Sequence, residues 1–80
     1  MKYGSIVQIS GPVVDVRFEQ DSLPRIREAL TVSLNGEQRV MEVAQHIGHD
    51  TVRCILLAGS EGLSRGMQVC APGTSITVPV

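Results

Sequence analysis

The chain has 80 residues, of which 42% are hydrophobic and 19% are charged, and its formal net charge is −1. A chain of this length is expected to form a single domain over residues 1–80, with little room for a deep substrate cleft beside its core. Without a basic run or a long apolar stretch, it offers no obvious surface for nucleic acid and no segment for direct membrane insertion.

The first part of the chain predicts two β-strands joined by a turn. In residues 13–19, Val14, Val16 and Phe18 alternate with charged side chains, which gives a strand one apolar and one charged, solvated face. Gly11-Pro12 separates this run from the apolar residues 6–9 and is expected to turn the chain. No secretory or transit segment precedes these strands, which favours a cytoplasmic location.

The middle of the chain predicts a hairpin. Residues 22–29 are compatible with either a loop or one helical turn, and residues 30–34 then alternate as a strand. Asn35-Gly36 follows, and this dipeptide is the strongest short-range hairpin signal because a type I′ turn needs positive φ at both central residues. The sequence therefore predicts a tight connection to the next strand, which contains Glu42.

The last third predicts further strands separated by turns. Residues 48–50 break one pair, and residues 52–57 are apolar enough for burial on both faces. Residues 67–71 and 76–80 also alternate. The turn residues expected between these strands are glycine- and proline-containing: Gly62, Gly66, Pro72 and Gly73.

Together these patterns predict six or seven short strands with turn signals roughly every 8–12 residues. A single small sheet would leave exposed edges, whereas closure into a barrel removes them. We therefore expect an all-β fold, a closed or nearly closed six-stranded antiparallel barrel. Its core should be aliphatic, since Tyr3 and Phe18 are the only aromatic residues.

One short motif resembles a catalytic one. Residues 62–66 match G-x-S-x-G, in which a serine nucleophile sits between a strand and a helix. Here Ser64 is followed by a strand-like run, and no Asp, Glu or His follows it to complete a triad. The motif is better explained as two glycines that shape a loop between strands, so no catalytic residue is expected.

The histidines and cysteines do not indicate a metal site. His46 and His49 have H-x-x-H spacing, but a zinc site needs three or four protein ligands. Cys54 and Cys70 lack paired C-x-x-C spacing and are expected to be reduced, half-buried thiols. The sequence also lacks G-x-x-x-x-G-K-[ST], the loop that cradles nucleotide phosphates, so no cofactor is expected to bind.

Several blocks of the sequence, in order, are similar to the beta subunit of F-type ATP synthases. These blocks are residues 6–16, 42–48, 51–53, 61–66 and 76–80. Within the second block, Gln45 and His46 favour the catalytic beta subunit over the related noncatalytic alpha subunit. The resemblance covers nearly the whole chain.

The resemblance implies an N-terminal barrel that packs between alpha subunits in an alternating alpha–beta hexamer, on the side away from the membrane. It implies that the nucleotide-binding and C-terminal domains are absent here, and that Mg-ATP or Mg-ADP is bound by the missing domain. The parent complex would lie on the cytoplasmic face of a bacterial inner membrane. Candidate interface residues are His46, Arg53, Ile55 and Leu57, and whether the isolated barrel is a monomer stays open.

Overall fold

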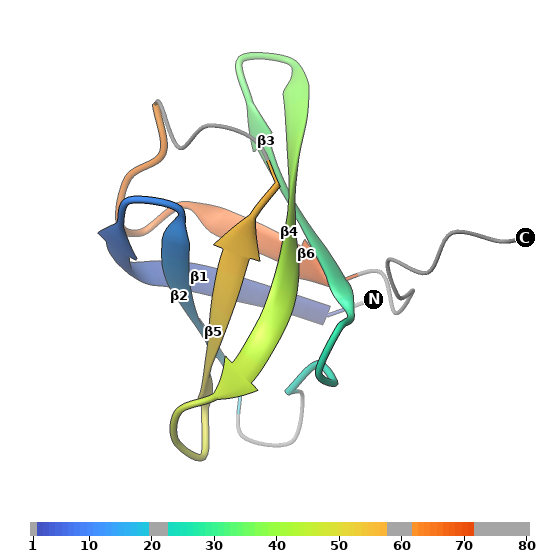
Figure 1. The fold of residues 1–80 in the computed structure, drawn as a ribbon. Coiled ribbons are helices and arrows are strands. Elements are labelled where there is room, and N and C mark those ends of the chain that lie inside the picture. Colours follow the sequence, from blue (N-terminus) through green and yellow to red (C-terminus); the bar gives the residue numbers. More distant parts are fainter. Residues whose placement is uncertain (1, 20–22, 58–61, 72–80) are drawn as a thin grey trace, which may run out of the picture.

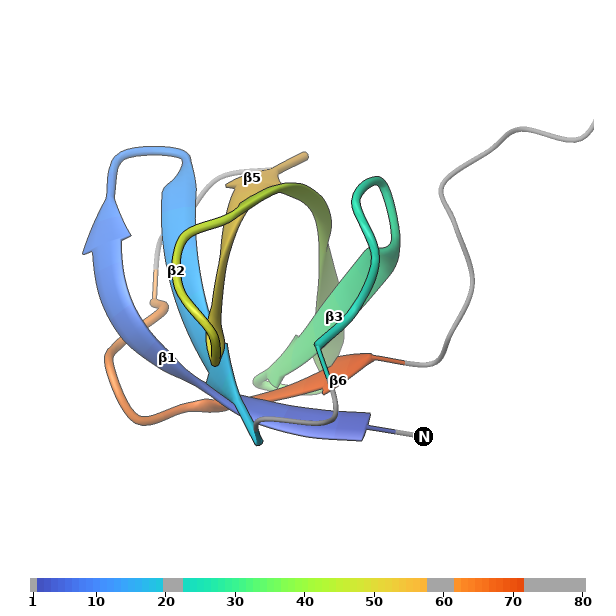
Figure 2. The same cartoon turned by 90° about the horizontal axis from the view of Figure 1, so that it is seen from below.

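The alternating segments form six antiparallel β-strands that close into a barrel (Figures 1 and 2). The computed structural model describes residues 2–19, 23–57 and 62–71. The strands around the barrel follow the order β1-β2-β5-β4-β3-β6, so the fold class predicted from the sequence is confirmed. Their bounds are β1 (Lys2–Ser10), β2 (Val13–Phe18), β3 (Ala29–Leu34), β4 (Glu37–His46), β5 (Thr51–Leu56) and β6 (Gln68–Ala71).

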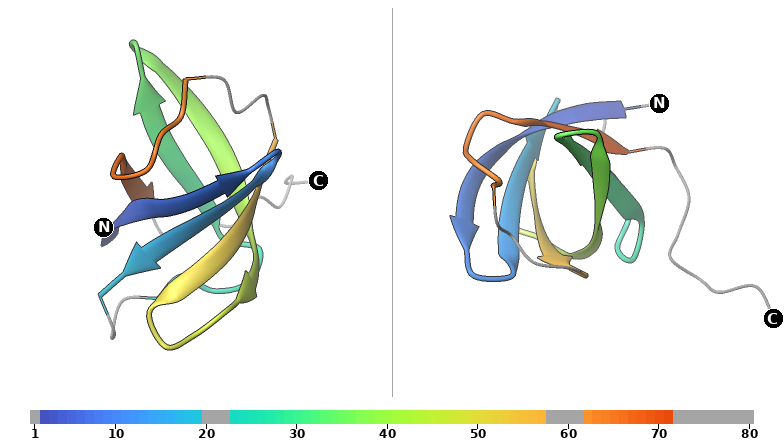
Figure 3. Two further views of the ribbon diagram at one scale, coloured as in Figure 1. Left: turned by 90° about the vertical axis from the view of Figure 1, so that its left-hand side faces the viewer. Right: turned by 90° about the horizontal axis from the view of Figure 1, so that it is seen from above.

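The core fills the inside of the barrel and is aliphatic apart from one phenylalanine. Each strand contributes alternate residues to it, as the period of two in the sequence requires. Figure 3 shows the strands curving around the barrel axis. The buried hydrophobic residues are Ile6, Val14, Val16, Phe18, Leu30, Val32, Met41, Val43, Val52, Cys54, Leu56, Val69 and Ala71.

Two tight hairpins connect neighbouring strands. Gly11-Pro12 is the whole loop between β1 and β2, because Ser10 pairs directly with Val13. Asn35 and Gly36 form the loop between β3 and β4 with φ values of 53° and 83°. Positive φ at both positions is the backbone requirement of a type I′ turn, which matches the right-handed twist of the strands it joins.

Two bulges bend the longest strands around the barrel. The pairing of β1 with β2 shifts between Ile6 and Gln8, and that of β4 with β5 shifts between Val43 and Gln45. Each bulge inserts one unpaired residue and increases the local bend and twist of its strand. This curvature allows a sheet of only six strands to close on itself.

The structure corrects the predicted burial of residues 52–57 and decides between the two alternatives for residues 22–29. β5 is not buried on both faces: Val52, Cys54 and Leu56 enter the core, but Leu57 is 56% exposed. The outward residues of β5 itself, Thr51, Arg53 and Ile55, are half-buried, and among the residues that the structure describes no second layer packs on this wall. In residues 22–29, the described part is a loop with a turn, and no helical turn forms.

Pro72, Gly73 and the expected strand 76–80 lie outside the described residues. Among the residues that the structure does describe, none belongs to a helix long and apolar enough to cross a membrane.

Candidate interaction surface

The outer wall of the barrel separates into apolar and polar rows of side chains. Residues that pair directly across neighbouring strands point to the same face of a sheet, so the strand register determines which outward side chains are neighbours. Because the even-numbered residues of β2, β3 and β5 fill the core, their odd-numbered residues line the outside. The rows below follow from this register.

The first apolar row crosses four strands and ends just after β5. It runs from Tyr3 through Cys70, Thr31 and Val40 to Leu57, which follows β5 and donates its backbone N–H to the carbonyl oxygen of Val40 at 3.1 Å. Tyr3 is 52% exposed and Leu57 is 56% exposed. The two most exposed members are therefore at opposite ends of the row, on β1 and just after β5.

A second apolar row lies beside the first. It contains Val13, Ile55 and Ala29, all half-buried, together with Glu42 between Ile55 and Ala29. We call these two sets the apolar rows. Thr31 and Glu42 interrupt the apolar side chains of these rows, and most members are half-buried. The exposed members, Tyr3 and Leu57, are therefore the candidates for contact with a partner.

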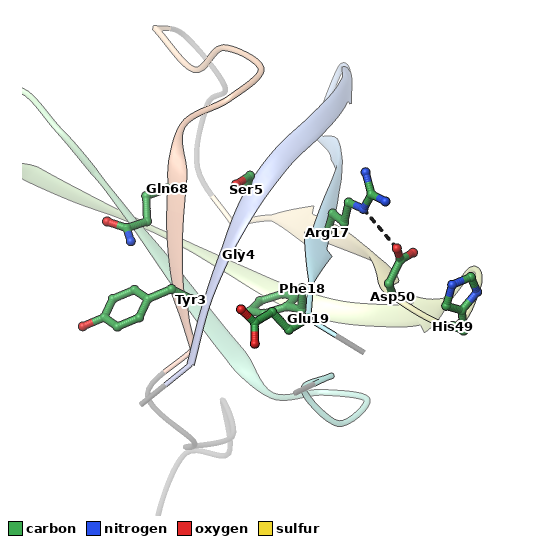
Figure 4. Close-up of a pocket in the computed structure, with 9 residues that line it drawn as sticks. All are labelled: Tyr3, Gly4, Ser5, Arg17, Phe18, Glu19, His49, Asp50 and Gln68. Atoms are coloured by element: carbon green, nitrogen blue, oxygen red, sulfur yellow. Dashed lines mark hydrogen bonds and ion pairs between the residues drawn. The ribbon is translucent and has the colours of Figure 1, made fainter. Parts of the chain in front are cut away.

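Two polar rows follow the apolar rows along β2 and β5, toward the end of β2 and the start of β5. One contains Gln8, Asp15, Arg53 and Gln45, and the other contains Gln68, Ser5, Arg17 and Thr51. Ion pairs hold both rows together. Figure 4 shows one of them, between Arg17 and Asp50, at the edge of a shallow groove of about 590 Å³.

The first ion pair corrects the prediction of a solvated charged face on β2. Asp15 is only 6% exposed, and its two carboxylate oxygens lie 3.0 and 3.4 Å from the guanidinium nitrogens of Arg53. The hydrogen bond from Arg53 to this carboxylate, and then the opposite charge, raise the pKa of Arg53. Direct pairing with a long side chain on β5 covers Asp15, which the alternation within β2 alone could not indicate.

The second ion pair joins β2 to the turn before β5. Arg17 Nε lies 3.0 Å from Asp50 Oδ2, and the Thr51 hydroxyl donates to Asp50 Oδ1 at 2.9 Å. The Thr51 hydrogen bond, followed by the one from Arg17, lowers the pKa of Asp50. In Figure 4, His49 and Tyr3 point away from this pair on either side.

The catalytic-looking motif lies on the surface. Ser64 is exposed, and its backbone N–H donates to Met67 Sδ at 3.2 Å. Its hydroxyl has no hydrogen-bond partner within the described part of the chain. Strand β6, rather than a helix, begins at Gln68. Without a base in contact, the serine lacks the activation that a nucleophile requires.

The two histidines of the H-x-x-H pair do not form part of a metal-binding cluster. The His46 Nε2–H donates to the carbonyl oxygen of Pro24 at 2.7 Å, while His49 is exposed on the turn after β4. Within the described ranges, no group of three or more His, Cys, Asp or Glu side chains could hold a metal ion. Cys54 is buried, as a small core hydrophobe, and Cys70 is half-buried on the outer wall.

Of the four interface candidates, Ile55 and Leu57 belong to the apolar rows, Arg53 to a polar row, and His46 to the end of β4. Tyr3 and Val40 were not expected from the sequence, because only the pairing of distant strands places them in the same row. Comparison with known protein families gives one further finding: residues 6–73 match the beta-barrel domain of the ATP synthase alpha/beta family.

Proposed function

Because this chain belongs to the ATP synthase alpha/beta family, of which it carries the β-barrel domain, we propose that it is a non-catalytic assembly module. In this proposal it is the N-terminal barrel of the catalytic beta subunit of a proton-translocating ATP synthase. The residues that favour beta over alpha are Gln45 and His46, for the sequence similarity described above. The barrel contacts the alpha subunits on either side in an alternating alpha–beta hexamer.

The observation that carries this proposal is the distribution of the apolar rows. A subunit in a closed ring touches two neighbours through two different patches of its surface. The first row has its exposed apolar ends at Tyr3 and Leu57, on well-separated parts of the wall. Each end supplies an apolar contact for one neighbour, and the half-buried Ile55 and Val40 extend the Leu57 end. His46 and Arg53 lie nearer the polar margin of this surface.

Nucleotide chemistry is assigned to another part of the parent subunit. A phosphate-binding loop presents successive backbone N–H groups and a lysine to the phosphates, and this sequence contains no such motif. The sequence therefore offers no group of the kind that holds the phosphates of Mg-ATP. We propose that the nucleotide is bound outside the barrel and that the complex is peripheral on the membrane.

The experiment is sedimentation velocity of the chain with purified alpha subunit, comparing wild type with Leu57→Asp. A charge at this 56% exposed position should leave the barrel folded but weaken association about tenfold or more, because the charge would be buried against an apolar partner. Val7→Asp is the matched control, since Val7 is 38% exposed and lies outside the rows. Circular dichroism establishes that both variants are folded.

Equal association of Leu57→Asp and wild type would exclude the Leu57 end of the row as an interface. Equal weakening by Val7→Asp would indicate a nonspecific effect of charge and would also contradict the proposed surface.

A further inference from the structure

The loop before β3 carries an exposed turn with the sequence Arg-Ile-Arg-Glu, residues 25–28. We call it the arginine turn, and Figure 1 shows it in teal before β3 begins. Arg25 and Arg27 are exposed, and Ile26 between them is 49% exposed. Three successive side chains therefore point away from the barrel core, and the apolar one lies between two cations.

Hydrogen bonds on both sides hold this turn in place. The Glu28 backbone N–H donates to the Arg25 carbonyl oxygen at 3.0 Å, and the Arg25 N–H donates to Glu28 Oε1 at 3.1 Å. The Arg27 N–H donates to the Val43 oxygen at 2.7 Å, and the Val43 N–H donates to the Glu28 oxygen at 3.0 Å. These bonds make the turn a continuation of the β3–β4 pairing. Because it is already ordered, it would lose little conformational entropy when a partner binds.

The backbone of the turn is strained at its centre. Arg27 has φ of 73°, in the left-handed region that glycine adopts readily and that other residues avoid. It occupies the third position of a four-residue turn with positive φ, where type II turns favour glycine. Glycine would adopt this conformation without that cost, so the strain at Arg27 is compatible with a role of its side chain outside the folding of the barrel.

The charges of the turn differ from those of the arginines on the barrel strands. Arg17, Arg39 and Arg53, which lie on the barrel wall, each form an ion pair. Within the described part of the chain, Arg25 and Arg27 form none. The neighbouring carboxylate of Glu28 is only 8% exposed and accepts a bond from the turn backbone, so neither exposed arginine has an ion-pair partner among the described residues.

We propose that the arginine turn is a contact for an acidic surface of a neighbouring subunit, with Ile26 entering an apolar recess between carboxylates of that partner. Guanidinium groups pair with carboxylates in a bidentate geometry, and a flanked apolar side chain supplies the buried centre of such a contact. The proposal rests on the proposed assembly function and adds to it a second, electrostatic patch beside the apolar rows.

The test measures association of the 80-residue chain with purified alpha subunit for wild type and for Arg25→Glu/Arg27→Glu. We expect charge repulsion to weaken the binding of the double variant by at least about tenfold, while Arg25→Lys/Arg27→Lys retains part of the affinity. Arg65→Glu is the control, because Arg65 is likewise exposed and unpaired in the described chain but lies on another loop. Wild-type affinity should fall as salt rises, and the glutamate variant should lose this dependence.

The outcomes separate the two proposals. Association of wild type together with equal association of the double variant would overturn the role of the arginine turn and leave the assembly function intact. Equal weakening by Arg65→Glu would also overturn it, since the effect would then follow net charge. No association of wild type at saturating concentration would contradict the assembly function itself, and the role of the turn with it.

Discussion

At the scale of single residues, Gly4 is the position where the barrel wall has least space. A Cβ built on Gly4 would lie 2.6 Å from the Arg17 carbonyl oxygen and 3.0 Å from side-chain carbons of Val16 and Phe18. The oxygen belongs to the backbone of the paired strand β2 and cannot move without disturbing the β1–β2 ladder. The absence of a side chain therefore allows the two strands to approach at the edge of the core.

Gly4→Ala should destabilise the barrel by about 1–3 kcal/mol, the usual cost of overpacking in a filled site. Urea unfolding measures this change, with Ser5→Ala, an exposed neighbour on the same strand, as the control. A Gly4→Ala variant as stable as wild type would show that β1 and β2 can separate without cost.

Asp50 should contribute to acid stability. The hydrogen bonds from Thr51 and Arg17 lower its pKa below the ordinary value of 3.8. A carboxyl whose folded-state pKa is depressed stabilises the fold fully above its unfolded pKa, and this contribution is lost as pH falls through the folded pKa. We expect Asp50→Asn to flatten the loss of stability below about pH 4 relative to wild type. Urea midpoints measured down this pH range would contradict the account if both proteins fell in parallel.

The two thiols should differ in reactivity. Burial raises the pKa of Cys54 to about 12, and only the thiolate reacts readily with alkylating agents. Cys70 is half-buried on the outer wall, within reach of solvent. During treatment with iodoacetamide at about pH 8, we expect Cys70 to be modified first and Cys54 only on unfolding. Mass spectrometry over time measures this order, and early modification of Cys54 would show that the core opens.

At the scale of elements, the left-handed backbone of the arginine turn should lower the stability of the barrel, while its side chains are proposed to contact a partner. A left-handed non-glycine residue costs about 1–2 kcal/mol, and glycine loses about 0.5–1 kcal/mol through its greater freedom in the unfolded chain. Arg27→Gly should therefore stabilise the barrel by about 0.5–1 kcal/mol, measured by thermal or urea unfolding. Arg25→Gly is the matched control, because Arg25 does not have positive φ and should gain nothing. A loss of stability in Arg27→Gly would mean that its side chain supports the fold.

The strands and turns were largely predictable because they depend on local chemistry. Alternation identified the strands, and Asn35-Gly36 identified the type I′ hairpin through its need for positive φ. It was harder to predict whether the outward apolar residues around Leu57 are covered or exposed. A strand buried on both faces and a strand with an uncovered interface face have the same apolar sequence. Only a second layer of structure distinguishes them, and alternation within one strand carries no information about that layer.

The features that the sequence did not reveal depend mainly on the pairing of strands that are distant in the chain. The burial of Asp15 comes from its register with Arg53, 38 residues further along the chain. The row from Tyr3 to Leu57 likewise depends on β6 lying between β1 and β3. A one-residue slip of any strand would move every side chain to the other face, so such rows cannot be derived from local patterns. The left-handed conformation of Arg27 also had no signal, because glycine is the residue that normally marks it.

At the scale of the whole molecule, the barrel combines one core with an outer wall of two kinds. The polar rows connect β2 to β5 through Asp15–Arg53 and to the turn before β5 through Arg17–Asp50. The apolar rows instead leave Tyr3 and Leu57 exposed at opposite ends. Barrel closure removes the strand edges that would otherwise recruit other chains by β-pairing. We propose that contact with a neighbour uses side chains of the outer wall, at the apolar rows and the arginine turn.

The most direct test of this account is methyl NMR of the isotopically labelled chain, titrated with unlabelled alpha subunit. The account predicts that the methyl signals of Leu57, Ile55 and Val40 shift or broaden, and that Val7 stays unchanged as an internal control. Perturbation of Val7 with an unaffected Leu57, or no change in any signal at saturating alpha subunit, would contradict the claim that the apolar rows form the assembly surface.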